Sequence, residues 1–262
     1  MTLQMPPPLT EQMARGPVLG PINLIPSALL VEHLCAVPFD FVWVDMEHGP
    51  QTIEDLASAV PICLGRGVTP IVRVPGVHDW AVKWVLDQGV RGVVFPFINS
   101  VADARHAISA CRYPLAGHRG YFPNVAATRW GTDPGDYVAR ADAEIAVILQ
   151  IEADAGVQAL DQIAALEGWD VLFVGPFDLS SSYGKLGQVT DPQVAAAIDR
   201  VREVAHAAGR YAGILAVTPE EIRGRIDEGF DFIAVNPDVG IVSEAIGRYW
   251  EGIAAQLPRS QA

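Results

Sequence analysis

The stretch FDFVWVDMEHGPQTIEDLASAVPICL, residues 39–64, contains the repeating unit from which the fold is predicted. Its first part, Phe39–Val44, is an apolar run rich in β-branched and aromatic residues, as expected for a strand covered on both faces. Its last part, Thr52–Leu64, places apolar side chains at helical spacing. The stretch therefore predicts one strand followed by one helix, joined by a short polar segment.

The same rhythm recurs along the chain. Further strands are predicted over Val18–Ile25, Pro70–Val74, Gly92–Phe95, Ile145–Ile151, Asp170–Val174, Tyr211–Leu215 and Phe230–Val235. Further helices are predicted over Trp80–Leu86, Ala102–Cys111, Ala155–Leu166, Val194–Ala208, Pro219–Glu228 and Ser243–Leu257. About eight strands alternating with about eight helices predict a (β/α)8 barrel. A doubly wound open sheet is the alternative, although it usually has fewer strands.

We expect one barrel domain over residues 1–262, because no linker rich in Pro, Gly or Ser divides the chain. The longest irregular stretch is Tyr113–Asp136. An irregular segment of this length in a compact domain is usually a lid or a binding segment.

Composition excludes several classes of protein. With 50% hydrophobic and 19% charged residues the chain is not intrinsically disordered. Its 18 Lys+Arg against 31 Asp+Glu argue against nucleic acid as a partner. No leader and no membrane-spanning run is evident, so we expect a cytoplasmic protein that is not bound to a membrane. The three cysteines occur singly and are interpreted as buried free thiols.

Polar side chains gather at the carboxyl ends of the predicted strands, where barrel enzymes place their active sites. They are Asp45, Glu47 and His48 after the second strand, Arg73 after the third, Gln150 and Glu152 at the fifth, and the turn Gly175–Asp178 after the sixth.

The residue types suggest a metal and acid/base chemistry. Glu152 and Asp178 offer only oxygen ligands, which suit Mg²⁺ or Mn²⁺. The alternative is that they bond the backbone, with Asp178 as a helix N-cap. His48 is the candidate acid/base, unless it is merely an exposed loop residue. Arg73 could bind a carboxylate or an oxyanion, or simply pair with a neighbouring acid.

Other residues are interpreted structurally. The remaining histidines lack metal-ligand spacing in the sequence, and we interpret them as solvated or structural: His33, His78, His106, His118 and His206. Neither Lys83 nor Lys185 lies at a strand end, which argues against an enzyme that forms a Schiff base with its substrate.

The ordered motifs resemble the HpcH/HpaI family of metal-dependent pyruvate aldolases. They are FDFVWVDMEHGP (Phe39–Pro50), IVRVPG (Ile71–Gly76), LDQGVRGVVFP (Leu86–Pro96), GHRG (Gly117–Gly120), ILQIEADAGV (Ile148–Val157) and VLFVGPFDLSSSYG (Val171–Gly184). The combination of D-x-E-H-G-P, Q-I-E and G-P-x-D-L-S is specific, whereas any one of these motifs alone would not be.

This resemblance implies reversible aldol cleavage of 4-hydroxy-2-oxo acids to pyruvate or hydroxypyruvate and an aldehyde, through an enolate held at a divalent metal (Mg²⁺, Mn²⁺ or Co²⁺). Glu152 and Asp178 would bind the metal. Arg73 would stabilise the enolate, His48 would be the acid/base, and Asp45 would orient the site. The substrate would contact Gln150, Gly175, Pro176, Phe177, Asp178 and Leu215.

The resemblance also gives Asp87 the role of raising the basicity of His48. Asp87 is predicted at the end of a helix, at the bottom of its own barrel, so it could reach only the His48 of a neighbouring subunit. The resemblance therefore implies a homo-oligomer, a hexamer built as a trimer of dimers, in which the helix Ser243–Leu257 is exchanged.

Phe177 and the Tyr121–Pro123 stretch are bulkier than the residues typical of the family. These departures affect the expected choice of aldehyde. Alternative functions are a lyase acting on a CoA thioester, as in the related citrate lyase branch, an enzyme acting on phosphoenolpyruvate, and a barrel without catalytic activity.

Overall fold

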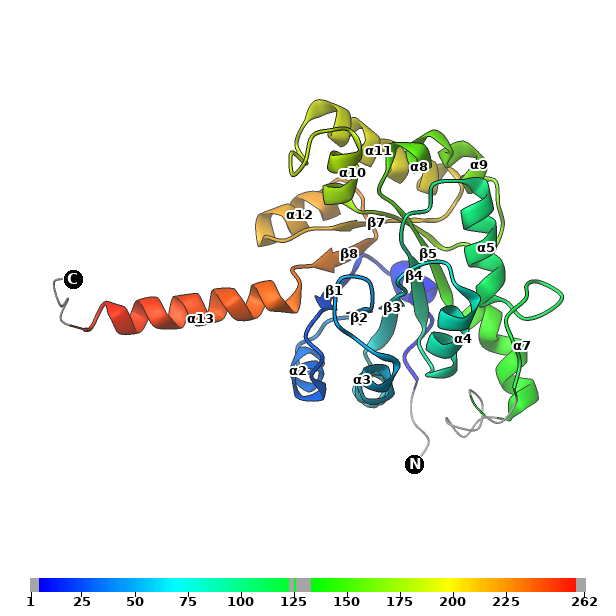
Figure 1. The fold of residues 1–262 in the computed structure, drawn as a ribbon, viewed down its shortest axis with the longest axis horizontal. Helices are drawn as coiled ribbons and strands as arrows, with labels where there is room; N and C mark the ends of the chain where they lie inside the picture. The colour runs from blue at the N-terminus through cyan, green and yellow to red at the C-terminus, as the bar shows by residue number, and fades with distance from the viewer. Residues whose placement is uncertain (1–4, 123–124, 126–132, 258–262) are drawn as a thin grey trace.

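The structure is a computed structural model that describes residues 5–122, 125 and 133–257. Within them, eight parallel strands close into a barrel in chain order, with β1 paired to β8 (Figure 1). The strands are β1 (Val18–Asn23), β2 (Phe41–Asp45), β3 (Thr69–Arg73), β4 (Gly92–Phe95), β5 (Ala146–Ile151), β6 (Val171–Val174), β7 (Tyr211–Leu215) and β8 (Phe232–Val235). The predicted (β/α)8 barrel is confirmed, and the open sheet is excluded because the sheet has no free edge.

The structure describes twelve helices, most of which follow a strand and cover the outside of the barrel (Figure 1). They are α1 (Leu9–Met13), α2 (Ala28–Leu34), α3 (Ile53–Gly65), α4 (Asp79–Asp87), α5 (Val101–Cys111), α7 (Pro134–Glu144), α8 (Asp154–Gln158), α9 (Leu160–Ala164), α10 (Pro176–Ser182), α11 (Pro192–Ala207), α12 (Pro219–Asp227) and α13 (Asp238–Ala254).

The prediction from periodicity missed the short helices α1, α2 and α10, which have too few turns to show an apolar stripe. The helix predicted over Ala155–Leu166 is two short helices, α8 and α9, separated at Ala159. Part of the predicted irregular stretch Tyr113–Asp136 is helical, because α7 begins at Pro134 behind the N-cap Asp133. Residues 123–124 and 126–132 of that stretch, and hence part of the expected lid, lie outside the described residues.

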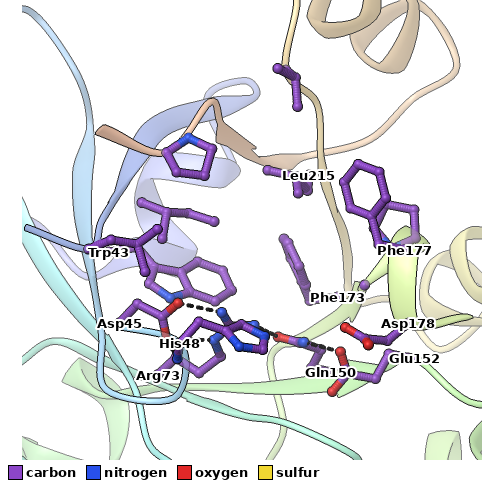
Figure 2. A pocket seen from close by; sticks show the side chains of 16 residues that line it. Trp43, Asp45, His48, Arg73, Gln150, Glu152, Phe173, Phe177, Asp178 and Leu215 are labelled. Carbon is purple, nitrogen blue, oxygen red and sulfur yellow. Dashed lines mark hydrogen bonds and ion pairs between the residues drawn. The ribbon is translucent and has the colours of Figure 1, made fainter. Parts of the chain in front are cut away.

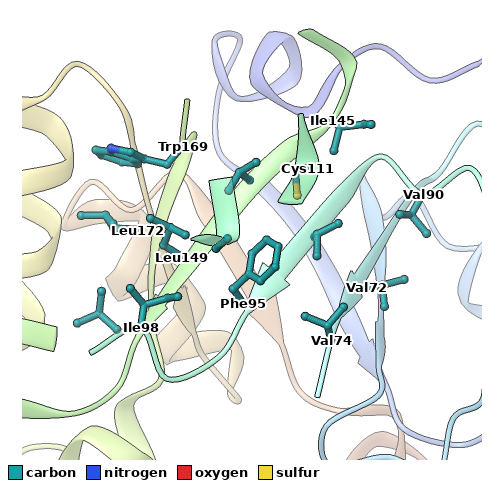
Figure 3. Packing of buried hydrophobic residues seen from close by; sticks show 14 of the residues in the cluster. Val72, Val74, Val90, Phe95, Ile98, Cys111, Ile145, Leu149, Trp169 and Leu172 are labelled. Atoms are coloured by element: carbon teal, nitrogen blue, oxygen red, sulfur yellow. The ribbon is translucent and has the colours of Figure 1, made fainter. Parts of the chain in front are cut away.

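Two apolar layers surround the sheet. Side chains such as Phe41, Ile71 and Phe232 fill the barrel interior, where the rings of Phe41 and Phe232 stack with centroids 4.4 Å apart. The alternate residues of the same strands pack outward against the helices, as Val72, Leu149 and Leu172 do in Figure 3. The three cysteines are buried and free, as predicted.

The N-terminal end of the barrel is closed by α1. Leu9 and Met13 of this helix are buried in the interior cluster. The side chain of Gln12 donates a hydrogen bond to the hydroxyl of Thr69 at the start of β3, 2.8 Å long. The opposite, C-terminal mouth is therefore the end of the barrel that a ligand can enter.

The last helix, α13, leaves the barrel as an arm (Figure 1). Its first residue, Asp238, is buried and accepts hydrogen bonds from the backbone N–H groups of Leu24 and Ile25 and from the side chain of Asn23. Beyond Asp238 no residue of α13 is buried. Among the described residues, no helix is both long and apolar enough to cross a membrane.

Candidate active site at the mouth of the barrel

The side chains of the candidate site are brought together by the alternation of strand residues. Trp43 and Asp45 of β2, and Ile71 and Arg73 of β3, point into the barrel because successive side chains of a strand face opposite sides. A pocket of about 270 Å³ opens at the C-terminal mouth (Figure 2). It is lined by Ile22, Leu24, Trp43, Asp45, His48, Arg73, Gln150, Glu152, Phe173, Gly175, Pro176, Phe177, Asp178, Leu215, Val217 and Pro237.

Arg73 is held in one orientation by its neighbours. Its Nε donates to Asp45 Oδ1 at 2.9 Å, and its Nη2 donates to Asp45 Oδ2 at 2.5 Å. Its Nη1 lies 3.5 Å from the amide oxygen of Gln150, and the guanidinium lies over the ring of Trp43. Burial alone would lower the pKa of Arg73, but the hydrogen bonds and charge of Asp45 outweigh it and raise the pKa. The result is a fixed permanent cation facing the pocket.

Glu152 lies one residue beyond β5 and is almost fully buried. One carboxylate oxygen accepts a hydrogen bond from the backbone N–H of Phe97 at 2.7 Å, and the other accepts one from the side chain of Gln150. Burial raises the pKa of Glu152 from its ordinary value of 4.5 to about 7, because these hydrogen bonds offset the loss of water only in part.

Glu47 adds a further acidic group with an incomplete set of partners. Its Oε2 is buried and has no hydrogen-bond donor, although the charged Nε of Arg73 lies 3.1 Å away. Burial raises the pKa of Glu47, and the charges of Asp45 and Asp178 add to this effect. Four carboxylates thus share one permanent cation, Arg73. This excess of carboxylate oxygens, from Asp45, Glu47, Glu152 and Asp178, fits a hard divalent cation.

Gly175 allows the backbone after β6 to approach Glu152 closely. A Cβ atom at Gly175 would lie 2.5 Å from Glu152 Oε2 and 3.2 Å from Gln150 Nε2. The next residues begin α10, in which Asp178 lies in the first turn and no side chain caps the helix. Asp178 is therefore not the N-cap that the sequence left open, and its carboxylate faces the pocket beside Glu152 (Figure 2).

His48 lies at the rim, in the loop after β2. Its backbone N–H lies 3.4 Å from Asp45 Oδ1, and its ring Nε2 is 4.0 Å from Glu47 Oε2. Its side chain is 59% exposed, so it is open to a substrate or to another subunit.

Asp87 lies outside this pocket. It ends α4 at the opposite end of the barrel, where its Oδ1 accepts a hydrogen bond of 3.2 Å from the buried guanidinium of Arg119. Burial raises the pKa of Asp87, against the opposing charges of Arg119 and Lys83. No contact links it to His48 of the same chain in the part that the structure describes.

The pocket wall includes every other residue that the resemblance assigns to the site, whereas Glu47 lies beside Arg73 outside the lining. The sequence analysis missed its apolar side, formed by residues such as Leu24, Val217 and Pro237, and the Trp43 ring beneath Arg73. The period-two alternation of β2 carries a signal for Trp43, because it lies two residues before Asp45. Leu24, Val217 and Pro237 lie in loops, where no periodicity marks the residues that turn inward.

The C-terminal mouth of this closed (β/α)8 barrel carries carboxylates, a fixed arginine and a histidine. Barrel enzymes have their active sites at this end, so the chain belongs to that class of protein. The family model described as HpcH/HpaI aldolase/citrate lyase matches residues 25–245. The chain belongs to this family, and it is a carbon–carbon lyase.

Two kinds of aldolase are among the relatives of this chain. The chain is 36% identical over 215 residues to a hydroxypyruvate/pyruvate aldolase of Chromohalobacter salexigens, covering 82% of this chain and 84% of that protein. It is 35% identical over 227 residues to a 5-keto-4-deoxy-D-glucarate aldolase of Enterobacter sp. (strain 638), covering 87% and 88%.

Solved structures share the fold of this chain. An HpcH/HpaI aldolase/citrate lyase family protein from Burkholderia cenocepacia J2315 is 34% identical with a TM-score of 0.89, covering 94% of this chain and 98% of that one. The citrate synthase SbnG is 30% identical with a TM-score of 0.86, covering 95% and 98%.

Proposed function

We propose that the chain catalyses the reversible aldol cleavage of 4-hydroxy-2-oxo acids to pyruvate or hydroxypyruvate and an aldehyde. The observation that carries this proposal is the guanidinium of Arg73, which Asp45 and Gln150 hold facing the buried carboxylate of Glu152 across the pocket. The names of the relatives support the same reaction.

Glu152 and Asp178 would hold a divalent cation, Mg²⁺, Mn²⁺ or Co²⁺, because they are neighbouring oxygen ligands in a pocket with excess negative charge. When bound, such a cation acts as a Lewis acid that polarises the keto group of the ketoacid. The backbone N–H groups of Phe177 and Asp178, at the start of α10, suit the carboxylate of the same substrate.

Arg73 stabilises the charge that develops during the reaction. Its guanidinium donates hydrogen bonds toward the C2 oxygen of the substrate, where negative charge accumulates as the enolate forms. Because Asp45 already fixes the guanidinium, little reorganisation is needed when that charge appears. Gln150 contacts both Arg73 and Glu152 and therefore fixes the positions of these two side chains relative to each other.

His48 moves the proton. In the cleavage direction its ring nitrogen accepts the proton of the C4 hydroxyl, the C3–C4 bond breaks, and the electron pair of that bond forms the enolate while the aldehyde is released. A proton returned to C3 then completes pyruvate. The exposed position of His48 at the rim suits contact with the aldehyde half of the substrate.

The working unit in this proposal is a homo-oligomer, a hexamer formed as a trimer of dimers, with one barrel domain in each chain. The exposed face of α13 carries Val239, Ile246 and Trp250, whose spacing places them on one side of the helix. A second copy would cover this face by exchange of the helix. In such an assembly Asp87, which is remote from its own pocket, acts on His48 of a neighbouring subunit.

The test follows exchange of deuterium into the methyl group of pyruvate by NMR in D₂O, which requires no knowledge of the aldehyde. The protein is stripped of metal and then given Mg²⁺, Mn²⁺ or Co²⁺ in turn. We expect metal-dependent exchange that is lost in Arg73→Lys, since lysine cannot reproduce the two-point pairing with Asp45. Arg91→Lys, a buried arginine that pairs with Glu144 outside the pocket, is the matched control and should retain exchange. Absence of exchange with every metal would contradict the proposal.

The alternative, a lyase acting on a CoA thioester, has less support. A pocket for CoA needs cations for its phosphates, and Arg73 is the one permanent cation among the described residues that line this pocket. Asp45 already neutralises that cation.

A further inference from the structure

A second cluster of metal-ligating side chains lies outside the pocket. Asp79 begins α4, His106 lies in the middle of α5, and His118 lies in the segment that follows α5. The Nε2 atom of His106 is 2.6 Å from Asp79 Oδ1, and the Nε2 atom of His118 is 2.9 Å from the same oxygen. The ligand atoms of the three residues all lie within 4.8 Å of one another.

Ser109 fixes the position of His118 through the ring nitrogen that does not face Asp79. The Nδ1 atom of His118 lies 2.7 Å from the hydroxyl of Ser109 on α5, and the backbone N–H of His118 donates to the carbonyl of Ser109 at 2.9 Å. A hydrogen bond at Nδ1 leaves Nε2 of the same ring to face the cluster, and this is how proteins orient histidine ligands of metals.

The cluster is accessible and has the ligand atoms that a cation requires. The three side chains are between 43% and 59% exposed. Asp79 contributes a carboxylate oxygen that contacts the Nε2 atoms of both histidines. The cluster therefore presents two imidazole nitrogens and one carboxylate oxygen to an ion.

We propose that Asp79, His106 and His118 form a divalent-metal site, distinct from the pocket, that selects ions of the Zn²⁺, Ni²⁺ and Co²⁺ type over Mg²⁺. Imidazole nitrogens favour these ions, whereas Mg²⁺ favours oxygen ligands. None of the three residues lines the pocket at the barrel mouth. The three protein ligands leave room for water in the coordination sphere.

An ion bound there joins α4, α5 and the segment after α5. That segment also contains Arg119, the partner of Asp87. The site would therefore act as a clamp that holds this segment against the two helices, and binding of the ion should stabilise the folded chain.

The chain contains a matched control. His206 Nε2 lies 2.9 Å from Asp231 Oδ2, an exposed pair of the same chemistry at the same distance. This pair has no second histidine in the part of the chain that the structure describes, since the cluster of Asp79 is the single group of three such ligands found there. A pair is a poor chelate, and it should hold Zn²⁺ far more weakly than three converging ligands.

The test is calorimetric titration of the full-length protein with ZnCl₂ in the Glu152→Gln/Asp178→Asn background, which removes the proposed ligands in the pocket. We expect one Zn²⁺ per chain, with at least a tenfold loss of affinity in His106→Ala/His118→Ala and no change in His206→Ala. Far-UV circular dichroism verifies that each variant is folded. Absence of Zn²⁺ binding, or binding that is unaffected by His106→Ala/His118→Ala, would overturn the proposal.

A second readout follows the coordination directly. Co²⁺ added to the same background should give visible d–d absorption that His106→Ala/His118→Ala abolishes and Mg²⁺ does not quench. Ser109→Ala keeps all three ligands and should weaken Co²⁺ binding by about 10- to 100-fold through the lost hydrogen bond to His118. A Co²⁺ spectrum that survives the loss of both histidines contradicts the site. Neither experiment measures aldolase activity. If the cluster binds no metal, the proposed function is therefore unaffected.

Discussion

Asp45 and Arg73 are register partners at the last positions of β2 and β3, and their side chains form a two-point ion pair in the mouth of the barrel. Asp45 Oδ1 also accepts a hydrogen bond from the backbone N–H of Glu47 at 3.0 Å. One carboxylate therefore fixes both the cation of the site and the start of the loop that carries His48.

Asp45→Asn should lower kcat for aldol cleavage by about 100-fold or more, because the guanidinium loses its fixed orientation. It should also lower the free energy of unfolding by about 3 kcal/mol, since the buried charge of Arg73 loses its two-point partner and keeps only Glu47 nearby. Steady-state kinetics and urea denaturation measure the two effects. Asp40→Asn is the control: Asp40 accepts a hydrogen bond from the backbone of Leu19 away from the pocket, so kcat should be retained. An Asp45→Asn variant with wild-type kcat would refute the positioning role.

Gly175→Ala should weaken binding of Mn²⁺ by about 10- to 100-fold, because the new methyl group must displace the carboxylate of Glu152. Electron paramagnetic resonance of free Mn²⁺ measures the affinity. Gly224→Ala in α12, where a Cβ atom meets nothing within 4 Å, is the control and should bind Mn²⁺ normally. Equal affinities in the two variants would mean that Glu152 is not a ligand.

Phe177→Ala should widen the range of aldehydes accepted. The Phe177 ring lies across the pocket from Asp45 (Figure 2). It narrows the pocket on its apolar side, where Leu215 and Val217 also lie. We expect kcat/KM for a bulky uncharged aldehyde to rise by about tenfold, on the order of the free energy of one or two buried methylene groups. Rates with propanal, benzaldehyde and succinic semialdehyde measure the profile. Leu186→Ala, an exposed residue outside the pocket, is the control. An unchanged profile would show that Phe177 does not contact the acceptor.

The metal-free protein should lose stability as the pH rises. The pKa of Glu152 is about 7 in the folded chain and near 4.5 when unfolded, so between these values the folded state binds the extra proton. Stability therefore falls as pH increases through this window, by about 2–3 kcal/mol between pH 5 and pH 8. Urea denaturation at a series of pH values measures this, and Glu152→Gln should remove that part of the dependence. Glu144→Gln, outside the pocket, should keep it, and identical profiles for wild type and Glu152→Gln would contradict the prediction.

Trp250→Glu should disrupt the oligomer, because it places a charge on the apolar face of α13 that the proposed assembly buries. Light scattering coupled to gel filtration measures the mass. Gln256→Glu adds the same charge at an exposed polar residue close to the end of this helix and should leave the mass unchanged. A wild-type chain that is already monomeric would contradict the proposed exchange of α13.

The sequence by itself determined the barrel and the polar side chains that line its C-terminal mouth. Strand patterns such as FDFVWV and DVLFV report burial on both faces, and a polar residue that directly follows such a run can only lie at the C-terminal mouth. Asp45, Arg73 and Glu152 could be placed together for this reason, and Asp178 lies in the turn that follows DVLFV. Their positions follow from local chain direction, which the period-two and helical patterns encode.

Only the tertiary structure decided how these side chains pair. From the sequence, Arg73 could bind either a substrate or a neighbouring acid. The register of β2 and β3 places it opposite Asp45, which is therefore its partner. The same holds for His106 and His118, whose spacing along the chain resembles no metal site. They meet Asp79 because α4, α5 and the following segment pack side by side. Contacts between distant segments depend on packing and register, which no local periodicity encodes, and so they appear only once the chain is folded.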